Sequence, residues 1–209
     1  MRLFLSLFCF ATFSFAADPG WIDMMPGKDL KGWTRIAIPP DKPVSEKQQW
    51  SVDSANNTLI CTGDQGHEWL RYDARQFENF VYHVEWKFTP VATPNPKYNS
   101  GVFVRNDEMG KVWHQAQTSS GSGGYIFAVT PVNGEPKRIT TVKERKGQFE
   151  KPAGEWNVYD IRCEGKHCSL TVNGELSSET DLEVLKGYLG LEAEGYLITF
   201  KNIRVKPLP

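Results

Sequence analysis

Short runs of residues that favour β-strand follow one another along most of this 209-residue sequence, and turn-forming residues separate them. Many runs alternate apolar with polar side chains, and they are rich in Val, Tyr, Phe and Trp, as strands with one buried face are. Glycine, proline and asparagine fill the gaps. This pattern predicts an all-β fold in which two antiparallel sheets pack as a β-sandwich.

The sequence predicts only one helical turn, at Leu182–Lys186. The ranges expected to be strands are Trp33–Ile36, Gln49–Val52, Thr58–Cys61, Trp69–Tyr72, Phe80–Thr89, Val102–Arg105, Val112–Gln117, Tyr125–Val129, Arg138–Thr141, Trp156–Glu164, Ser169–Val172, Glu175–Ser178, Gly187–Glu194 and Leu197–Pro207.

The first residues have the pattern of an export signal. Arg2 is followed by an apolar run, Leu3–Phe15, that is short for a membrane span, and small residues at Ser14 and Ala16 suit a signal peptidase. We expect residues 1–16 to be a cleaved signal peptide and residues 17–209 to be a single domain, secreted or periplasmic. The alternative is an N-terminal buried strand.

Charge and hydropathy exclude several kinds of partner. The sequence has 24 Lys and Arg residues against 25 Asp and Glu residues, a formal net charge of −1. Nucleic acids and anionic membranes both favour a basic surface. No second long apolar segment follows the leader, so we expect no nucleic-acid partner, and no membrane partner once the signal is cleaved.

Two of the cysteines flank a hairpin connection. Alternation places Cys163 and Cys168 on the apolar face of neighbouring strands, where they form a disulfide in an oxidising compartment or remain two buried thiols. We expect Cys61 to be a buried thiol. No cysteine and histidine spacing indicates a zinc site.

The stretch Tyr98–Phe127 contains three neighbouring strand-type runs, and polar side chains share one face of them. Trp113, Gln115 and Gln117 fall on the same side of their run, and Arg105 lies on the polar side of the preceding one. Long polar and aromatic side chains on adjacent strands indicate a ligand-binding surface. A solvated outer face without a ligand is the alternative.

Four segments, in this order, match a known family: WIDMMPGKDLKGW, YNSGVFVRN, EWNVYDIRCEGKHCSLTVNGEL and GYLGLEAEGYLITFKNIRVKPL. Together they span Gly20–Leu208 and resemble the bacterial 3-keto-disaccharide hydrolase domain family, formerly a domain of unknown function. The resemblance implies a concanavalin-like jelly roll with a carbohydrate groove on its concave sheet. It also implies an exported protein that processes glycosides oxidised at carbon 3 of a sugar.

The family pattern carries over with two departures. Its NSG-x-F-x-R segment matches residues 99–105, which implies that Arg105 lies on the concave face. Where the family usually has Glu, one residue and Gln, this sequence has Gln115 and Gln117. Where the family usually reads GLQ-x-HG, this sequence has Glu192 and Glu194.

Three glutamates are candidates for acid and base chemistry. Glu192 and Glu194 are two apart on an expected strand, so they share a face with side-chain bases about 7 Å apart. Near Arg105 they are expected to split into one ionised and one protonated carboxyl, unless both are solvated surface residues. Glu85 faces away from the apolar side of its strand and matches a glutamate common in the family.

Several further residues are candidates for the site. His114 has the proton affinity of a general base, although alternation favours a hydrogen-bonded core histidine at this position. Trp69 and Trp113 suit stacking against a sugar, although Trp69 can equally be a core residue. Tyr125 is expected to contact substrate at the start of its strand.

A 3-keto sugar has an acidified C2 proton, so the implied reaction needs a base, an acid and a group that stabilises the enolate. We expect acid and base duty from Glu85, Glu192 and Glu194, charge stabilisation from Arg105, and sugar-hydroxyl binding from Gln115 and Gln117. We expect no cofactor, and no metal at this face. The alternatives to a glycoside hydrolase are a noncatalytic, lectin-like glycan-binding module and a structural surface domain.

Overall fold

The computed structural model describes residues 19–209, so the expected signal peptide lies outside the described part. Strands are the only regular elements of this part, and none of its residues belong to a helix that could cross a membrane. The strands are β1 (Ile22–Asp23), β2 (Trp33–Ala37), β3 (Trp50–Asp53), β4 (Thr58–Cys61), β5 (Glu68–Tyr72), β6 (Phe80–Phe88), β7 (Ser100–Asn106), β8 (Trp113–Thr118), β9 (Ile126–Val132), β10 (Glu135–Thr140), β11 (Asn157–Glu164), β12 (His167–Val172), β13 (Glu175–Asp181), β14 (Tyr188–Ala193) and β15 (Ile198–Pro207).

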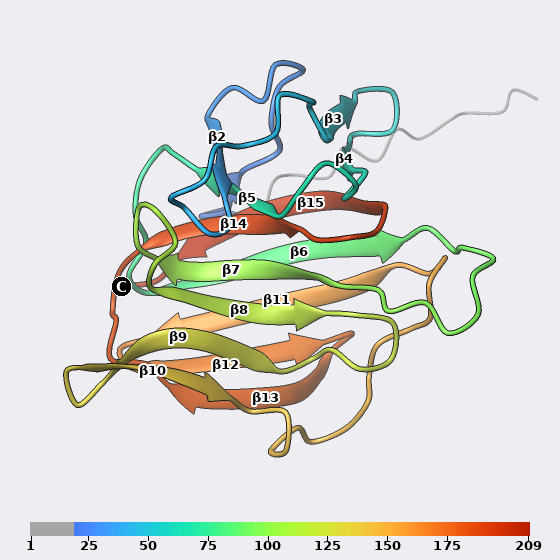
Figure 1. Ribbon diagram of the computed structural model, residues 1–209. Helices are drawn as coiled ribbons and strands as arrows, with labels where there is room; N and C mark the ends of the chain where they lie inside the picture. Colours follow the sequence, from blue (N-terminus) through green and yellow to red (C-terminus); the bar gives the residue numbers. More distant parts are fainter. Residues whose placement is uncertain (1–18) are drawn as a thin grey trace, which may run out of the picture.

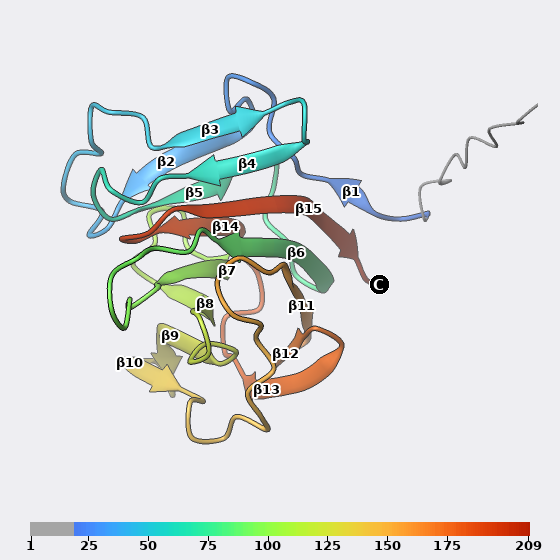
Figure 2. The ribbon, with the colours of Figure 1, turned by 90° about the vertical axis from the view of Figure 1, so that its right-hand side faces the viewer.

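Two antiparallel sheets lie face to face (Figure 1). The eight-stranded sheet has the order β13-β12-β11-β6-β15-β4-β3, with β1 paired to β15. The seven-stranded sheet has the order β10-β9-β8-β7-β14-β5-β2. Figure 2, turned by 90°, shows the two layers side by side. The all-β, antiparallel sandwich expected from the sequence is confirmed.

Strand alternation builds the core between the sheets. In β6 the side chains of Phe80, Tyr82, Val84, Trp86 and Phe88 are buried, and the residues between them are partly exposed. Full burial of one large apolar side chain contributes about 1.5–3 kcal/mol. Because this many apolar side chains must face inward, the register of the strands also determines which residues face outward.

Each range expected to be a strand lies on a strand of the structure, with ends that differ by a few residues. The two-residue strand β1 has no expected counterpart. The helical turn expected at Leu182–Lys186 is wrong. Leu182 is buried, and its amide donates a hydrogen bond to the Lys166 carbonyl at 2.8 Å, so this segment docks against the β11–β12 connection.

The cysteines of the described chain are all buried thiols. Cys163 and Cys168 lie directly opposite each other in β11 and β12, with 3.4 Å between their sulfur atoms. Of the two arrangements left open by the sequence, the structure therefore has the unpaired one. Burial raises the pKa of the Cys61 thiol to about 12, so it stays protonated at neutral pH.

Candidate functional site

The outer face of the seven-stranded sheet, turned away from the eight-stranded sheet, contains a cavity of about 370 Å³. This volume is within the range of about 300–1,000 Å³ that is usual for ligand pockets. We call it the open-face cavity. Its aromatic residues are Trp69, Phe103, Trp113 and Phe127, and its polar residues are His67, Asn99, Asn106, Gln115, Gln117, Arg138, Glu192 and Glu194.

Two glycines make room for the cavity in the middle of the sheet. Gly101 of β7 lies where a Cβ atom would collide with the Gln115 side chain. Gly190 of β14 lies where a Cβ atom would collide with the Trp69 ring. Because these central positions carry no side chain, Gln115 of β8 lies over Gly101 and Trp69 of β5 lies over Gly190.

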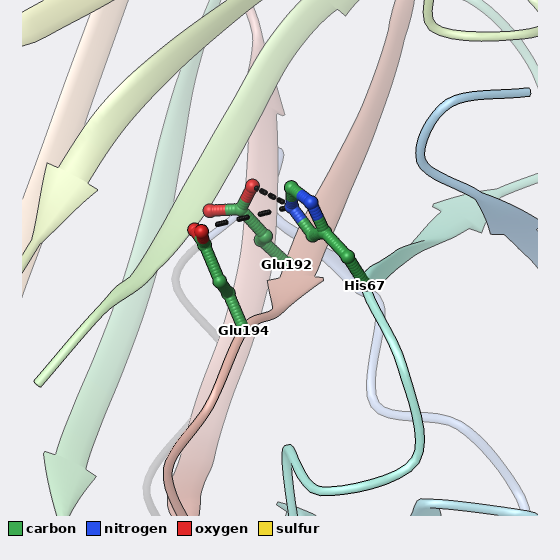
Figure 3. Close-up of side chains that lie close together, drawn as sticks. All are labelled: His67, Glu192 and Glu194. Carbon is green, nitrogen blue, oxygen red and sulfur yellow. Dashed lines mark hydrogen bonds and ion pairs between the residues drawn. The ribbon is translucent and has the colours of Figure 1, made fainter.

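Two glutamates and a histidine meet at one end of the cavity (Figure 3). His67 lies directly before β5, Glu192 lies in β14, and Glu194 follows the end of β14. The Nε2 atom of His67 is 2.8 Å from Oε1 of Glu192 and 3.9 Å from Oε2 of Glu194. We call these three residues the acidic triad.

Burial and charge both act on the acidic triad. Glu192 is only 4% exposed, and this burial raises the pKa of its carboxyl. The charge of Glu194 raises it further, and the hydrogen bonds from His67 and Gln115 act in the opposite direction. For His67, burial lowers the pKa, but the hydrogen bond and charge of Glu192 outweigh burial and raise it overall. The arrangement therefore favours one proton shared between His67 and Glu192.

Side-chain amides hold the acidic triad and the wall beside it. The Nε2 atom of Gln115 donates a hydrogen bond to the second carboxylate oxygen of Glu192. The Nε2 atom of Gln117 donates to Oδ1 of Asn99 and, at 3.0 Å, to the Ser100 carbonyl. These bonds fix the Gln115 and Gln117 amides of β8 against β7 and β14. The polar side of the cavity is therefore formed without a bound ligand.

Aromatic rings form the rest of the cavity wall. Trp69 and Phe103 meet edge to face with centroids 5.6 Å apart, and Trp113 meets Phe127 in the same way at 5.0 Å. The Arg138 guanidinium lies 4.8 Å over the Phe127 ring. A wall of rings beside a polar end can bind a ligand that has both apolar and hydroxylated faces, as sugars do.

Arg105 does not reach the open-face cavity, so its expected place on that face is wrong. The backbone of Arg105 has a φ of 50°, and the pairing of β7 with β14 shifts register beside it. This bulge turns Arg105 out of the alternation. Its buried guanidinium donates to the carbonyls of Glu78 at 2.6 Å and Val184 at 3.3 Å. Asn106, one residue later, lines the cavity instead.

Glu85 also lies outside the cavity, so it is not part of the same acid and base group. It belongs to β6 of the eight-stranded sheet. Its side chain accepts a hydrogen bond from Asn202 at 2.5 Å and lies 3.2 Å from Nζ of Lys201. Its alternation with buried Val84 and Trp86 places it on the outer face of that sheet, the opposite side of the sandwich from the open-face cavity.

His114 is a core histidine, the arrangement that alternation favours, and its candidate role as a catalytic base is wrong. Its Nδ1 atom is 3.1 Å from the Val104 carbonyl, and Thr130 Oγ1 is 2.8 Å from its Nε2 atom. Burial lowers the pKa of His114 to about 4, so its imidazole is neutral at pH 7.

Tyr125 is partly buried just before β9, outside the residues that line the cavity.

The structure thus brings six of the expected residues together in one cavity: Trp69, Trp113, Gln115, Gln117, Glu192 and Glu194. It adds His67, Asn99 and Asn106. His67 is two residues before Trp69, and this spacing is the sequence feature that indicates that both side chains face the same side of the sheet. The Nδ2 atom of Asn106 and the Nε1 atom of Trp69 are buried donors without a hydrogen-bond partner.

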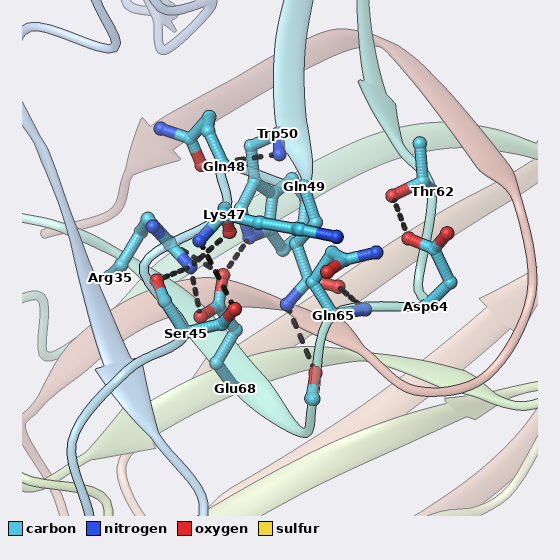
Figure 4. Close-up of polar contacts among 11 residues, drawn as sticks. Arg35, Ser45, Lys47, Gln48, Gln49, Trp50, Thr62, Asp64, Gln65 and Glu68 are labelled. Atoms are coloured by element: carbon cyan, nitrogen blue, oxygen red, sulfur yellow. Dashed lines mark hydrogen bonds and ion pairs between the residues drawn. The ribbon is translucent and has the colours of Figure 1, made fainter.

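An ion pair after His67 and a hydrogen bond before it hold the chain on its two sides, and Figure 4 shows the side chains of Arg35, Glu68 and Gln49 that make them. Arg35 binds both carboxylate oxygens of Glu68, at 2.8 and 2.7 Å, and the Trp50 indole donates to Glu68 at 2.8 Å. Gln49 donates to the Gly66 carbonyl at 3.0 Å. The residues before and after His67 are therefore held by β2, β3 and the loop before β3, which orients its imidazole.

Comparisons with known proteins agree with this architecture. A protein from Parabacteroides distasonis with the provisional name of glycosyl hydrolase has a TM-score of 0.61 at 16% identity, covering 91% of this chain and 94% of that one. Carbohydrate-binding module CBM66 from Bacillus subtilis has a TM-score of 0.60 at 15% identity, covering 84% and 95%. The Bacillus licheniformis β-glucanase has a TM-score of 0.52 at 11% identity, covering 90% and 97%. At these identities the likeness shows the fold.

Among proteins with curated descriptions, none matches the sequence. The family model described as the 3-keto-alpha-glucoside-1,2-lyase-like domain matches residues 20–206, which is nearly all of the described chain. The family resemblance found in the sequence is thereby confirmed. The protein belongs to the family of 3-keto-alpha-glucoside-1,2-lyase-like domains, a carbohydrate-active family with a concanavalin-like sandwich fold.

Proposed function

We propose that this protein is an exported enzyme that cleaves the glycosidic bond of a 3-keto-glycoside in the open-face cavity. One observation carries the proposal. A buried carboxylate, a second carboxylate and an imidazole meet at the end of a cavity lined by aromatic rings and amides. Groups that exchange protons are thus placed beside a surface suited to a sugar.

The reaction begins at C2 of the oxidised sugar. The ketone at C3 makes the C2 proton acidic, so a base can remove it. The electron pair of the C2–H bond then forms a C1–C2 double bond, the C1–O bond breaks, and the leaving oxygen takes up a proton. Addition of water across the double bond completes a net hydrolysis, and release before this addition makes the protein a lyase.

The positions within the acidic triad suggest roles. Glu194 has a side chain that is 38% exposed, so it is the proposed base for the C2 proton. His67 is the proposed proton donor to the leaving oxygen, and its bond to Glu192 holds the imidazole in place. Trp113 is partly exposed in the cavity wall and offers its ring to the apolar face of the sugar.

A noncatalytic glycan-binding module is the second candidate. The aromatic wall and the amides of Gln115 and Gln117 suit sugar binding whether or not a bond is broken. This candidate gives no role to the two carboxylates beside His67. The two functions therefore predict different effects of substitutions in the acidic triad, which would slow bond cleavage only if the protein is an enzyme.

Release of a coloured aglycone from a 3-keto-glucoside tests the enzyme. We expect Glu194→Gln and His67→Ala to slow release by about 10²–10⁴-fold, as the loss of a general acid or base does. Glu85→Gln, on the opposite face, is the matched control and should release aglycone at the normal rate. Saturable binding of the sugar without any release would favour the binding module.

A further inference from the structure

We propose that His67, Glu192 and Glu194 bind one divalent transition-metal ion at the end of the open-face cavity. One ligand atom from each residue lies within 4.8 Å of the other two. In Figure 3 the three side chains point toward a common space between β14 and the start of β5. The inference depends on the proposed function only for what the ion would do.

The spacing of the ligand atoms suits a single ion. Zinc binds imidazole nitrogen and carboxylate oxygen at about 2.0–2.2 Å, so two ligand atoms of one tetrahedral ion lie about 3.4 Å apart. The distances from His67 Nε2 to the oxygens of Glu192 and Glu194 are 2.8 and 3.9 Å, on either side of this value. Small rotations of the partly exposed side chains of His67 and Glu194 would bring the three ligand atoms to the coordination distance around the buried Glu192.

The ligand types indicate the class of metal. One neutral imidazole and two carboxylates carry a charge of −2, which a divalent cation neutralises. Imidazole suits zinc and iron, carboxylate suits manganese, and calcium and magnesium prefer sites made only of oxygen. Three protein ligands that leave a position open to the cavity are typical of a catalytic rather than a structural metal site.

Neighbouring residues hold the ligands in place before any ion binds. Gln115 binds the Glu192 oxygen that faces away from His67. The Ile38 amide donates to the His67 carbonyl at 2.9 Å, and Gln49 holds Gly66. Ligands fixed by such bonds usually bind metal more tightly than free side chains do. Burial of Glu192 beside Glu194 also leaves negative charge that a cation would compensate.

In the proposed reaction an ion held by His67 Nε2 would take over stabilisation of the leaving oxygen from the His67 proton, and Glu194, bound through one carboxylate oxygen, would keep its other oxygen for the C2 proton. A bound ion would also supply positive charge for a developing oxyanion, which Arg105 does not supply from its buried position. The inference reverses the sequence-based expectation of no metal at this face. The sequence names Glu192 and Glu194 as site residues but does not reveal that His67 joins them, because His67 and Glu192 are 125 residues apart.

The opposite face offers a matched control. His83 also has two carboxylates nearby, but its Nδ1 atom lies 2.7 Å from Asp160 and its Nε2 atom 3.8 Å from Glu85, so the two carboxylates face different ring nitrogens and do not converge on one ion. Lys201 lies 3.2 Å from Glu85 and already provides a positive charge. We therefore expect no metal binding by this second cluster.

Calorimetric titration of the metal-stripped protein with zinc chloride tests the inference. We expect one zinc ion per chain, and an affinity more than about 100-fold weaker in His67→Ala and Glu194→Gln, since even residues that only support a metal ligand contribute 10–100-fold. His83→Ala should bind zinc like the natural protein. Circular dichroism checks that each variant is folded.

Absence of zinc binding, or equal binding by all the variants, would overturn the inference. Turnover of a 3-keto-glucoside by a stripped protein that binds no zinc would also overturn it and leave the proposed function intact. One zinc ion bound through His67 and Glu194, without any turnover, would support the metal site and count against the proposed function.

Discussion

Glu192 is the residue whose chemistry depends most on its surroundings. It is buried at the end of a cavity, a second glutamate follows two residues later, and His67 and Gln115 bind its two oxygens. On a solvated strand the same side chain would be an ordinary ionised carboxylate. The chemistry of this site therefore comes from where the strands place Glu192, and not from the residue type alone.

His114 provides a test of burial at the residue scale. In the unfolded chain a histidine has a pKa near 6.5, and in the folded chain burial lowers the pKa of His114 to about 4. The unfolded state therefore binds more protons between these values, so folding stability contributed by His114 is lost as the pH falls through this window. We expect this loss to reach about 3 kcal/mol at pH 4.

Urea unfolding of the natural protein and of His114→Gln, between pH 7 and pH 4, measures this effect. The glutamine variant does not titrate, so the difference in unfolding free energy between the two proteins should shrink by about 3 kcal/mol across the window. Glu150 has the opposite effect, because burial raises its pKa to about 7 and its protonation adds stability as the pH falls. This effect is present in both proteins, so it cancels in the difference between them. A constant difference would show that His114 is not buried as a neutral imidazole.

At the scale of elements, the start of β5 depends on the ion pair between Arg35 and Glu68. Removal of Arg35 leaves the Glu68 carboxylate buried with only the Trp50 indole. Loss of one partner of a buried pair usually costs about 3–5 kcal/mol. We expect Arg35→Ala to lose stability in this range, measured by urea unfolding, and to slow turnover because His67 is no longer held.

The pair between Arg162 and Glu164 is the control for this prediction. Both of its side chains are about half exposed, at 49% and 55%, so Arg162→Ala should change stability by less than about 1 kcal/mol. Equal effects of the two substitutions would contradict the structural role given to Arg35 and Glu68.

Strand positions could be predicted from alternation, but irregular pairing could not. The runs around Trp113 and Glu192 were placed on strands with the correct side facing outward, because buried neighbours fix their register. Arg105 departs from its expected place because a bulge, which the sequence does not reveal, turns its side chain into the interior. His67 was missed as a partner of Glu192 because β5 and β14 are far apart in the chain and meet only in the sheet.

At the scale of the whole molecule, the two outer faces of the sandwich differ. The eight-stranded sheet presents paired charges such as Lys201 with Glu85, and the seven-stranded sheet presents the open-face cavity. The sequence predicts two sheets, a polar face and a common face for Glu192 and Glu194, but not that Glu85 lies on the other sheet. Glu85 and Glu192 became distinguishable only when the strand order of each sheet was known.

The central claim is that the acidic triad moves a proton at C2 of a 3-keto sugar. Proton NMR of a 3-keto-glucoside in heavy water measures this step directly, through the loss of the C2–H signal, whether or not the aglycone leaves. We expect exchange with the natural protein and with Glu85→Gln, and at least about 100-fold slower exchange with Glu194→Gln. Exchange that is equally fast with Glu194→Gln, or a natural protein that binds the sugar and exchanges nothing, would contradict the account.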